Sequence, residues 1–391
     1  MKWEKKKLCE CTEYITDGDH QPAPKADKGV HFIKIKDIVN NQVSFDAQVY
    51  VPQEYYDNLP MERKPQKEDV LYTVVGSFGI PSYVQTDELF CFERNIALLH
   101  PNKDIEPRFL YYSLKNPAFY KGVEIVANGS AQKLIPLSKL KDLKISVPDK
   151  EAQRHIADIL SAYDDLIENN QRQIKLLEEA AQRLYKEWFV DWRFPGHENT
   201  KIVDGVPEGW NEKTLSQVAN VIMGQSPKSE FYNSEKKGLP FHQGVGSYGV
   251  RFVMDDIYST SYTRIAEPNS ILFSVRAPVG RLNITKNKVV IGRGLAAINQ
   301  TDGCQSYLYY LLKNKFFKDN IVGNGSIFAS VSKDELLNQK FLIPERNLMM
   351  QFEKIVSQMD KQIENLDSKN KKLIEARDRL LPKLMSGEVE V

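Results

Sequence analysis

The chain repeats itself once, at long range. The segment FLYYSLKN at 109–116 returns as YLYYLLKN at 307–314, and KISVP at 144–148 returns as KFLIP at 340–344. Between them, NGSAQKL, which begins at Asn128, matches NGSIFAS, which begins at Asn324. An offset of 196–198 residues is too long for a solenoid repeat. Each copy is therefore predicted to be a globular module followed by a long helix.

The repeat extends into the modules but leaves one region out. Val70–Val74 aligns with Ile271–Val275, and Arg94 aligns with Arg293. Residues 25–65 show no visible counterpart in residues 226–262. A shared scaffold with different inserted loops is what two modules of one fold and different binding specificities would show.

The helices that follow the modules carry apolar residues at alternating steps of four and three. Such a seam over more than four heptads predicts a coiled coil. Asn170, Asn370 and Arg377 interrupt it, and buried polar residues at such positions fix register or partner choice. The residues assigned to the spacer and to subunit docking are Ile156, Leu160, Ile167, Asn170, Leu177, Leu184 and Trp188 in the first helix, and Ile363, Asn370 and Leu380 in the second.

The predicted fold is α+β or α/β, with two repeated globular domains and two long antiparallel coiled-coil helices. The first helix should end near Phe189 and the second near Leu381, because Pro382 interrupts it. Strands are expected at 70–75, 271–275 and 289–291, and shorter helices at 109–116 and 307–314. The expected ranges are 1–147 and 208–343 for the modules, 148–190 and 344–391 for the helices with the tail, and 191–207 for the linker.

Composition excludes several classes of protein. Hydrophobic residues make up 41% of the chain, so packed domains are expected, and no run of about 18 apolar residues predicts a membrane span. Four cysteines do not make a disulfide framework, which favours a cytoplasmic location with reduced thiols. The net charge is only +1, and only residues 208–343 are clearly basic, with 16 basic and 11 acidic residues. Composition alone therefore does not indicate DNA binding.

No catalytic or metal-binding motif is found. The phosphate loop GxxxxGK[ST], the zinc motif HExxH and the Asp/Asn-Pro-Pro-Tyr/Phe signature of amino-methyltransferases are all absent. Cys9, Cys11, His20 and His31 have no spacing typical of a zinc site. The sequence predicts a recognition protein with no catalytic residues, no metal and no cofactor of its own.

Three further segments are similar to one known family. They are LYKEWFVDWRFPG at 184–196, LLPKLMSGEV at 380–389 and ILFSVRAPVG at 271–280. With them, the chain resembles the specificity subunit of a type I restriction–modification system over essentially its whole length. The first module departs from the third segment, with Val75-Gly76-Ser77 where the second has Arg276-Ala277-Pro278.

The resemblance implies a division of labour. Each module would read one half of a bipartite, asymmetric site in double-stranded DNA through the major groove. The helices would set the spacer, about 6–7 bp for half-sites one turn apart, and dock two modification subunits. Those subunits would carry S-adenosylmethionine for adenine methylation, and restriction subunits would bring ATP-driven cleavage with Mg²⁺. The open alternative is a duplicated scaffold that binds proteins or glycans.

Candidate DNA-binding residues are polar or basic and lie at repeat-equivalent positions or in the unmatched loops. Arg276 and Gln243 are the preferred base readers, because arginine pairs with guanine and glutamine with adenine. Arg94 and Arg293 are equally well explained as scaffold or phosphate contacts. The full set is Lys25, Lys34, Lys36, Ser77, Arg94 and Lys133 in the first module, and Gln225, His242, Gln243, Arg276, Arg281 and Arg293 in the second.

Overall fold

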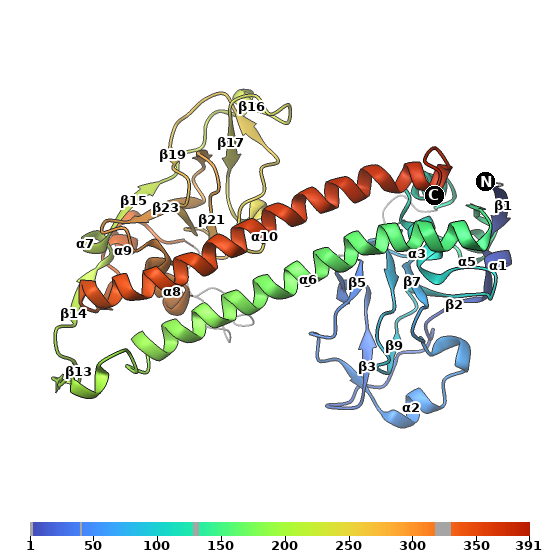
Figure 1. The fold of residues 1–391 in the computed structure, drawn as a ribbon, viewed down its shortest axis with the longest axis horizontal. Helices are drawn as coiled ribbons and strands as arrows, with labels where there is room; N and C mark the ends of the chain where they lie inside the picture. Colours follow the sequence, from blue (N-terminus) through green and yellow to red (C-terminus); the bar gives the residue numbers. More distant parts are fainter. Residues whose placement is uncertain (1–2, 40, 128–132, 317–329) are drawn as a thin grey trace. The chain divides into compact units, whose positions relative to one another are not determined.

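The computed structural model describes residues 3–39, 41–127, 133–316 and 330–391 (Figure 1). The segments 128–132 and 324–329, which carry most of the repeated NGS motifs, lie outside the described residues. The chain divides into two compact units, 1–171 with 368–391 (unit 1) and 172–367 (unit 2). Each long helix, α6 (Lys150–Phe189) or α10 (Arg346–Ser386), therefore contributes to both units.

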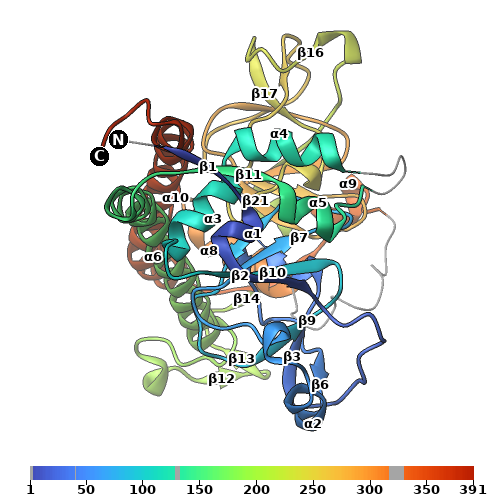
Figure 2. The same cartoon turned by 90° about the vertical axis from the view of Figure 1, so that its right-hand side faces the viewer.

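Unit 1 is built around a four-stranded antiparallel sheet, here called its central sheet. Figure 2 shows α3, α4 and α5 above this sheet and the strands of a second, outer sheet below it. The central sheet has the order β2 (Thr12–Asp17), β10 (Ile96–Pro101), β7 (Val70–Thr73), β8 (Pro81–Tyr83). The helices are α1 (Leu8–Cys11), α2 (Gln53–Asp57), α3 (Pro107–Lys115), α4 (Pro117–Val126) and α5 (Leu137–Asp142).

The outer sheet of unit 1 contains a parallel strand pair. Its order is β6 (Tyr50–Val51), β3 (Val30–Ile33), β9 (Phe90–Phe92), and β3 runs parallel to β9. Two further antiparallel pairs complete the unit: β1 (Glu4–Lys7) with β11 (Lys144–Val147), and β4 (Ile38–Val39) with β5 (Gln42–Val43).

Unit 2 repeats this plan. Its central sheet has the order β15 (Ala219–Met223), β23 (Leu295–Gln300), β20 (Ile271–Ser274), β21 (Leu282–Ile284), and β14 (Asn211–Thr214) pairs with β24 (Lys340–Ile343) as β1 does with β11. Its helices are α7 (Leu215–Val218), α8 (Gln305–Phe316) and α9 (Lys333–Leu337). The hairpin of β12 (Ile202–Val203) and β13 (Val206–Pro207) follows α6. Short 3₁₀ turns cover Ile35–Asp37, Met61–Arg63, His197–Asn199, Ser229–Phe231 and Val245–Ser247.

The inserted regions correspond in topology although their sequences do not align. The outer sheet of unit 2 has the order β16 (Tyr232–Asn233), β18 (Tyr258–Ser259), β17 (Leu239–His242), β22 (Val289–Ile291), β19 (Ile265–Ala266). Its middle part, β18-β17-β22, matches β6-β3-β9, including the parallel pair. The insertions are therefore variants of one outer sheet, and not unrelated loops. Strand pairing depends on backbone hydrogen bonds, which many side-chain sequences can satisfy.

The predicted elements are confirmed with small shifts in their ends. The expected strands at 70–75 and 271–275 are β7 and β20, the run 289–291 is β22, and the helices expected at 109–116 and 307–314 are α3 and α8. Burial explains why the apolar runs in the sequence predicted these strands. All four residues of β7 and of β20 are buried, as continuous apolar runs in covered strands should be.

The long helices pair antiparallel within each unit. In unit 1, Asn170 Nδ2 donates to Asn370 Oδ1 at 2.8 Å, and Arg377 forms an ion pair with Asp164. In unit 2, the rings of Phe189 and Phe352 lie 5.2 Å apart. Two of the three polar interruptions, Asn170 and Asn370, therefore meet one another, and Arg377 of α10 pairs with Asp164 of α6.

One expected helix end is wrong. Helix α10 continues through Pro382 to Ser386. Proline removes one N–H and crowds the carbonyl four residues earlier, which usually breaks a helix. Here it lies in the last turns, and Leu381, Leu384 and Met385 are buried in the core of unit 1. Their burial offsets the cost of the missing hydrogen bond.

The proposed seam residues pack inside the chain. Ile156, Leu160, Ile167, Asn170, Trp188, Ile363 and Asn370 are buried, and Leu177, Leu184 and Leu380 are partly buried. Buried side chains cannot contact another protein, so the seven buried residues do not dock a partner, whereas docking by Leu177, Leu184 and Leu380 stays a prediction. Their structural role is to pack α6 and α10 within each unit.

Replacing Asn170 with alanine is expected to lower the unfolding free energy by about 1–3 kcal/mol, because Asn370 Oδ1 would remain buried without its donor, although Asn370 Nδ2 still donates to the carbonyl oxygen of Ile167. Replacing Asn170 and Asn370 together with leucine should recover most of the loss, since no unsatisfied polar group remains. Urea denaturation of the three proteins measures both effects. An equal loss in the single and double variants would contradict this account.

Candidate nucleic-acid interface

In unit 1 the ends of the parallel strands β3 and β9 bring three candidate residues together. Lys34 follows β3 and Arg94 follows β9, so both lie where these strands end. Together with Lys25 they line a hollow of about 430 Å³, whose further lining includes His20 and Tyr50. Residues that are far apart in the chain thus form one polar edge, here called the strand-end edge.

A glycine allows the chain to cross the end of this parallel pair. A Cβ on Gly18 would lie 2.2 Å from the carbonyl oxygen of Phe92, and one on Gly224 of unit 2 would lie 2.1 Å from that of Gly292. Any side chain there would push the crossing segment away. The same close approach therefore shapes the strand-end edge in both units.

The two acidic residues that line this hollow, Asp19 and Glu93, already accept hydrogen bonds from the chain, and Glu93 Oε1 accepts the backbone N–H of Ile35 at 2.8 Å. Asp19 Oδ1 accepts the backbone N–H of Gln21 at 3.1 Å, and Oδ2 accepts the hydroxyl of Tyr55 at 3.1 Å. Its pKa is lowered, chiefly by the Gln21 hydrogen bond. Among the described residues, Lys25, Lys34 and Arg94 have no ion-pair partner. The hollow therefore offers cationic groups to an anionic ligand such as a phosphate backbone.

The strand-end edge of unit 2 has the same position and a different chemistry. Gln243 follows β17, Arg293 comes two residues after β22, and both are exposed. Gln225 is tied to this edge because its backbone N–H donates to the carbonyl oxygen of Ile291 at 2.9 Å. Gln243 thus stands after β17 where unit 1 has Lys34 after β3.

His242 is wrong as a DNA-contacting residue. Its side chain is 0% exposed, with Nδ1 at 2.9 Å from Ser247 Oγ and Nε2 at 3.2 Å from Asp255 Oδ1. The strand alternates its side chains between two faces, so the residue next to an outward-facing Gln243 points inward. His242 anchors the loop that follows it.

The remaining candidates lie on other loops or turns of the two units. Ser77 and Arg276 are exposed on the loops after β7 and β20. Lys133 Nζ lies 3.5 Å from Glu124 Oε1 and 5.2 Å from the centre of the Phe78 ring, and Arg281 is partly buried. Lys36 is exposed within a 3₁₀ turn. Arg276 lies beside the edge of unit 2, because the N–H of the preceding Val275 donates to the carbonyl oxygen of Gly294 at 2.9 Å, and Lys36 lies two residues after Lys34.

Sequence reasoning missed several residues beside Gln243. Ser226 Oγ donates to Gln243 Oε1 at 2.7 Å, and the hydroxyl of Thr263 donates to the carbonyl oxygen of Gln225. Arg264 is exposed, and its carbonyl oxygen accepts the N–H of Ile291 at 2.9 Å. All three lie in loops without periodicity, so no sequence signal connected them with Gln243.

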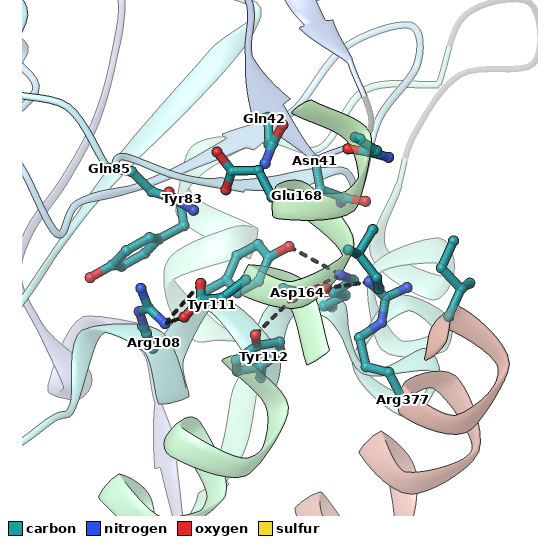
Figure 3. A pocket seen from close by; sticks show the side chains of 15 residues that line it. Asn41, Gln42, Tyr83, Gln85, Arg108, Tyr111, Tyr112, Asp164, Glu168 and Arg377 are labelled. Carbon is teal, nitrogen blue, oxygen red and sulfur yellow. Dashed lines mark hydrogen bonds and ion pairs between the residues drawn. The ribbon is translucent and has the colours of Figure 1, made fainter. Parts of the chain in front are cut away.

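A polar pocket of about 240 Å³ in unit 1 is a structural joint (Figure 3). Asp164 accepts the hydroxyl of Tyr112 at 2.7 Å and pairs with Arg377, and Arg108 pairs with Asp165 at 3.3 Å. Burial lowers the pKa of Lys115, whose Nζ donates to Tyr111 Oη at 3.1 Å. The charges are matched within the chain, which indicates packing of α3 on the long helices.

No group of three or more His, Cys, Asp or Glu residues within the described ranges could hold a metal ion. None of the described helices is both long and apolar enough to cross a membrane.

Two units of one topology that present different polar edges define a two-site recognition protein. A sequence model of the type I restriction modification DNA specificity domain matches residues 1–179 and 207–376. The chain belongs to this family of specificity subunits, whose role is the recognition of DNA sequence.

Relatives span nearly the whole chain. A putative type I restriction enzyme MjaX specificity subunit from Methanocaldococcus jannaschii is 30% identical, covering 100% of this chain and 94% of the relative. The HindI specificity subunit from Haemophilus influenzae is 25% identical and covers 92% and 94%. The crystal structure of a type I restriction-modification S subunit from M. genitalium has the same fold, with a TM-score of 0.62, 20% identity and coverage of 98% and 96%.

Proposed function

We propose that the chain reads a bipartite, asymmetric DNA site, one half with each strand-end edge. The observation that carries this is the topological match of the two edges combined with their different residues. Lys25, Lys34 and Arg94 form one edge, whereas Gln225, Gln243 and Arg293 form the other. Equal scaffolds with unequal polar groups would recognise two unequal half-sites.

We further propose that the chain acts as the non-catalytic subunit of a complex with two modification subunits, joined by restriction subunits for cleavage. A net charge of +1 supports partners that contribute phosphate contacts. Leu166, Leu176, Ile355 and Ile374 are exposed on α6 and α10, which supports protein docking on the outer faces of these helices. S-adenosylmethionine, ATP and Mg²⁺ would then bind the partner subunits.

The test measures DNA binding and methyl transfer by the chain alone and with modification subunits. We expect the complex to methylate a bipartite motif, and the chain alone to transfer no methyl group from S-adenosylmethionine. Replacing Lys34 and Arg94 together with alanine should reduce the dependence of log affinity on log salt by about 2, because each side chain would neutralise one phosphate. Lys67, an exposed lysine paired with Asp87, is the control position.

Three results would contradict the proposal. The first is methyl transfer by the chain alone, and the second is an unchanged salt dependence in the double variant. The third is binding of the complex to a protein or glycan with no preference for any DNA sequence, which would favour an interaction scaffold.

A further inference from the structure

The side-chain amide of Gln243 is held in one orientation before any ligand arrives. The hydroxyl of Ser226 donates to Gln243 Oε1 at 2.7 Å. The same Ser226 oxygen accepts the backbone N–H of Arg293 at 3.2 Å. These two bonds form a chain that runs from the Arg293 amide through Ser226 to Gln243. Ser226 thus accepts from the Arg293 amide and donates its single hydrogen to Gln243, whose Oε1 faces Ser226 in the structure.

The backbone around Gln243 is equally constrained. The N–H of Gly294 donates to the carbonyl oxygen of Gln243 at 3.2 Å, and the N–H of Gly292 donates to that of His242 at 2.8 Å. A Cβ on Gly292 would lie 2.5 Å from Gln243 Oε1, so the amide occupies space that only glycine leaves open. His242, the residue before Gln243, is held in place by its buried ring. Gln243 is therefore preorganised, which reduces the entropy cost of binding.

With Oε1 turned toward Ser226, the amino group of Gln243 is the part left for a ligand. Among the described residues, no hydrogen-bond acceptor is paired with its Nε2, and the side chain is exposed. Arg293, exposed on the same edge, can only donate. Both side chains therefore offer donors. In the major groove, guanine presents two acceptors, N7 and O6, whereas adenine presents one acceptor and one donor.

We propose that Ser226 is a positioning residue that fixes Gln243 as a donor, so that the edge of unit 2 reads guanine at one position of its half-site. This inference rests on the proposed function and changes one expectation from the sequence, because a free glutamine amide would favour adenine by donating and accepting at once. Without the Ser226 hydroxyl, the amide of Gln243 can rotate, so that its oxygen can accept a hydrogen bond from adenine and its amino group can donate one.

The test maps methylated motifs genome-wide by single-molecule sequencing, using the complex of the chain with its modification subunits. In Gln243→Leu, the preference for guanine over the other bases should fall roughly tenfold at one position of the motif. That position is guanine in the wild-type motif. In Ser226→Ala, the same position should broaden to guanine or adenine, with the other half-site unchanged. Ser226→Thr retains the hydroxyl and should retain guanine.

The ways in which the test can fail are distinguishable. If Gln243→Leu affects an adenine or a pyrimidine, or if Ser226→Ala leaves the motif unchanged, this inference is overturned while the proposed function stands. If Ser226→Ala weakens methylation equally at every sequence, Ser226 only stabilises the fold and the inference is also overturned. If the wild-type complex methylates no bipartite motif, the proposed function fails, and this inference fails with it.

Discussion

Replacing Arg251 with methionine is expected to lower the unfolding free energy of unit 2 by about 3–5 kcal/mol, the usual cost of removing one partner from a buried ion pair. Arg251 is 2% exposed. Its guanidinium pairs with Glu178 at 3.4 Å and with Asp360, and it donates to Tyr310 Oη at 3.2 Å. It also stacks 4.2 Å from the centre of the Tyr309 ring. The variant would leave two carboxylates without their cation.

Denaturant unfolding of the wild type and of matched variants measures this loss. Arg264→Met is the control, because Arg264 is an exposed arginine of the same unit, and its loss should stay within about 0.5 kcal/mol. Arg251→Lys should recover only part of the stability, since an ammonium group cannot form the planar fork that contacts several partners. A loss below about 1 kcal/mol for Arg251→Met would show that the buried charges are not stabilised by Arg251.

Each unit contains an aspartate–arginine ion pair beside two tyrosines, but the arginine comes from a different element in each unit. Tyr111, Tyr112 and Asp164 of unit 1 match Tyr309, Tyr310 and Asp360 of unit 2 in the repeat. In unit 1, the arginine paired with the aspartate is Arg377 of α10, whereas in unit 2 it is Arg251 from the inserted region. Because the arginine comes from the insertion, exchanging the insertion of unit 2 would also remove the partner of Asp360.

Lengthening both long helices by seven residues is expected to lengthen the spacer of the methylated motif by about 3 bp. Seven residues add about 10.5 Å of helix, and one base pair spans about 3.4 Å. The insertions belong after Gln171 in α6 and after Asp367 in α10, because the two units meet in the sequence at these points. Seven residues are two helical turns of the seam, so the heptad phase is preserved.

The matched control lengthens only α6. An insertion in one helix, for example beside Ala180, moves the Phe189–Phe352 contact out of register with the Asn170–Asn370 contact. We expect this protein to lose stability and activity. Motif mapping of the doubly lengthened complex gives the spacer. An unchanged spacer in a folded, active complex would show that α6 and α10 do not set it.

The sequence by itself determined the duplication, the two long helices and the strands of the central sheets. These features depend on local periodicity and on buried apolar runs, which leave a pattern along the chain. The seam even identified Asn170 and Asn370, which meet in the structure. The sequence also indicated Lys25, Lys34 and Arg94, but gave no reason for them to lie together.

Only the tertiary structure decided which polar groups share a site. The parallel pairings of β3 with β9 and of β17 with β22 join segments about sixty and about fifty residues apart, and backbone hydrogen bonds specify these pairings without leaving a side-chain pattern. The same pairing turned His242 inward and placed Ser226 against Gln243. Core packing likewise decided that α10 continues through Pro382. Contacts between distant residues depend on the whole fold, and for this reason local sequence could not reveal them.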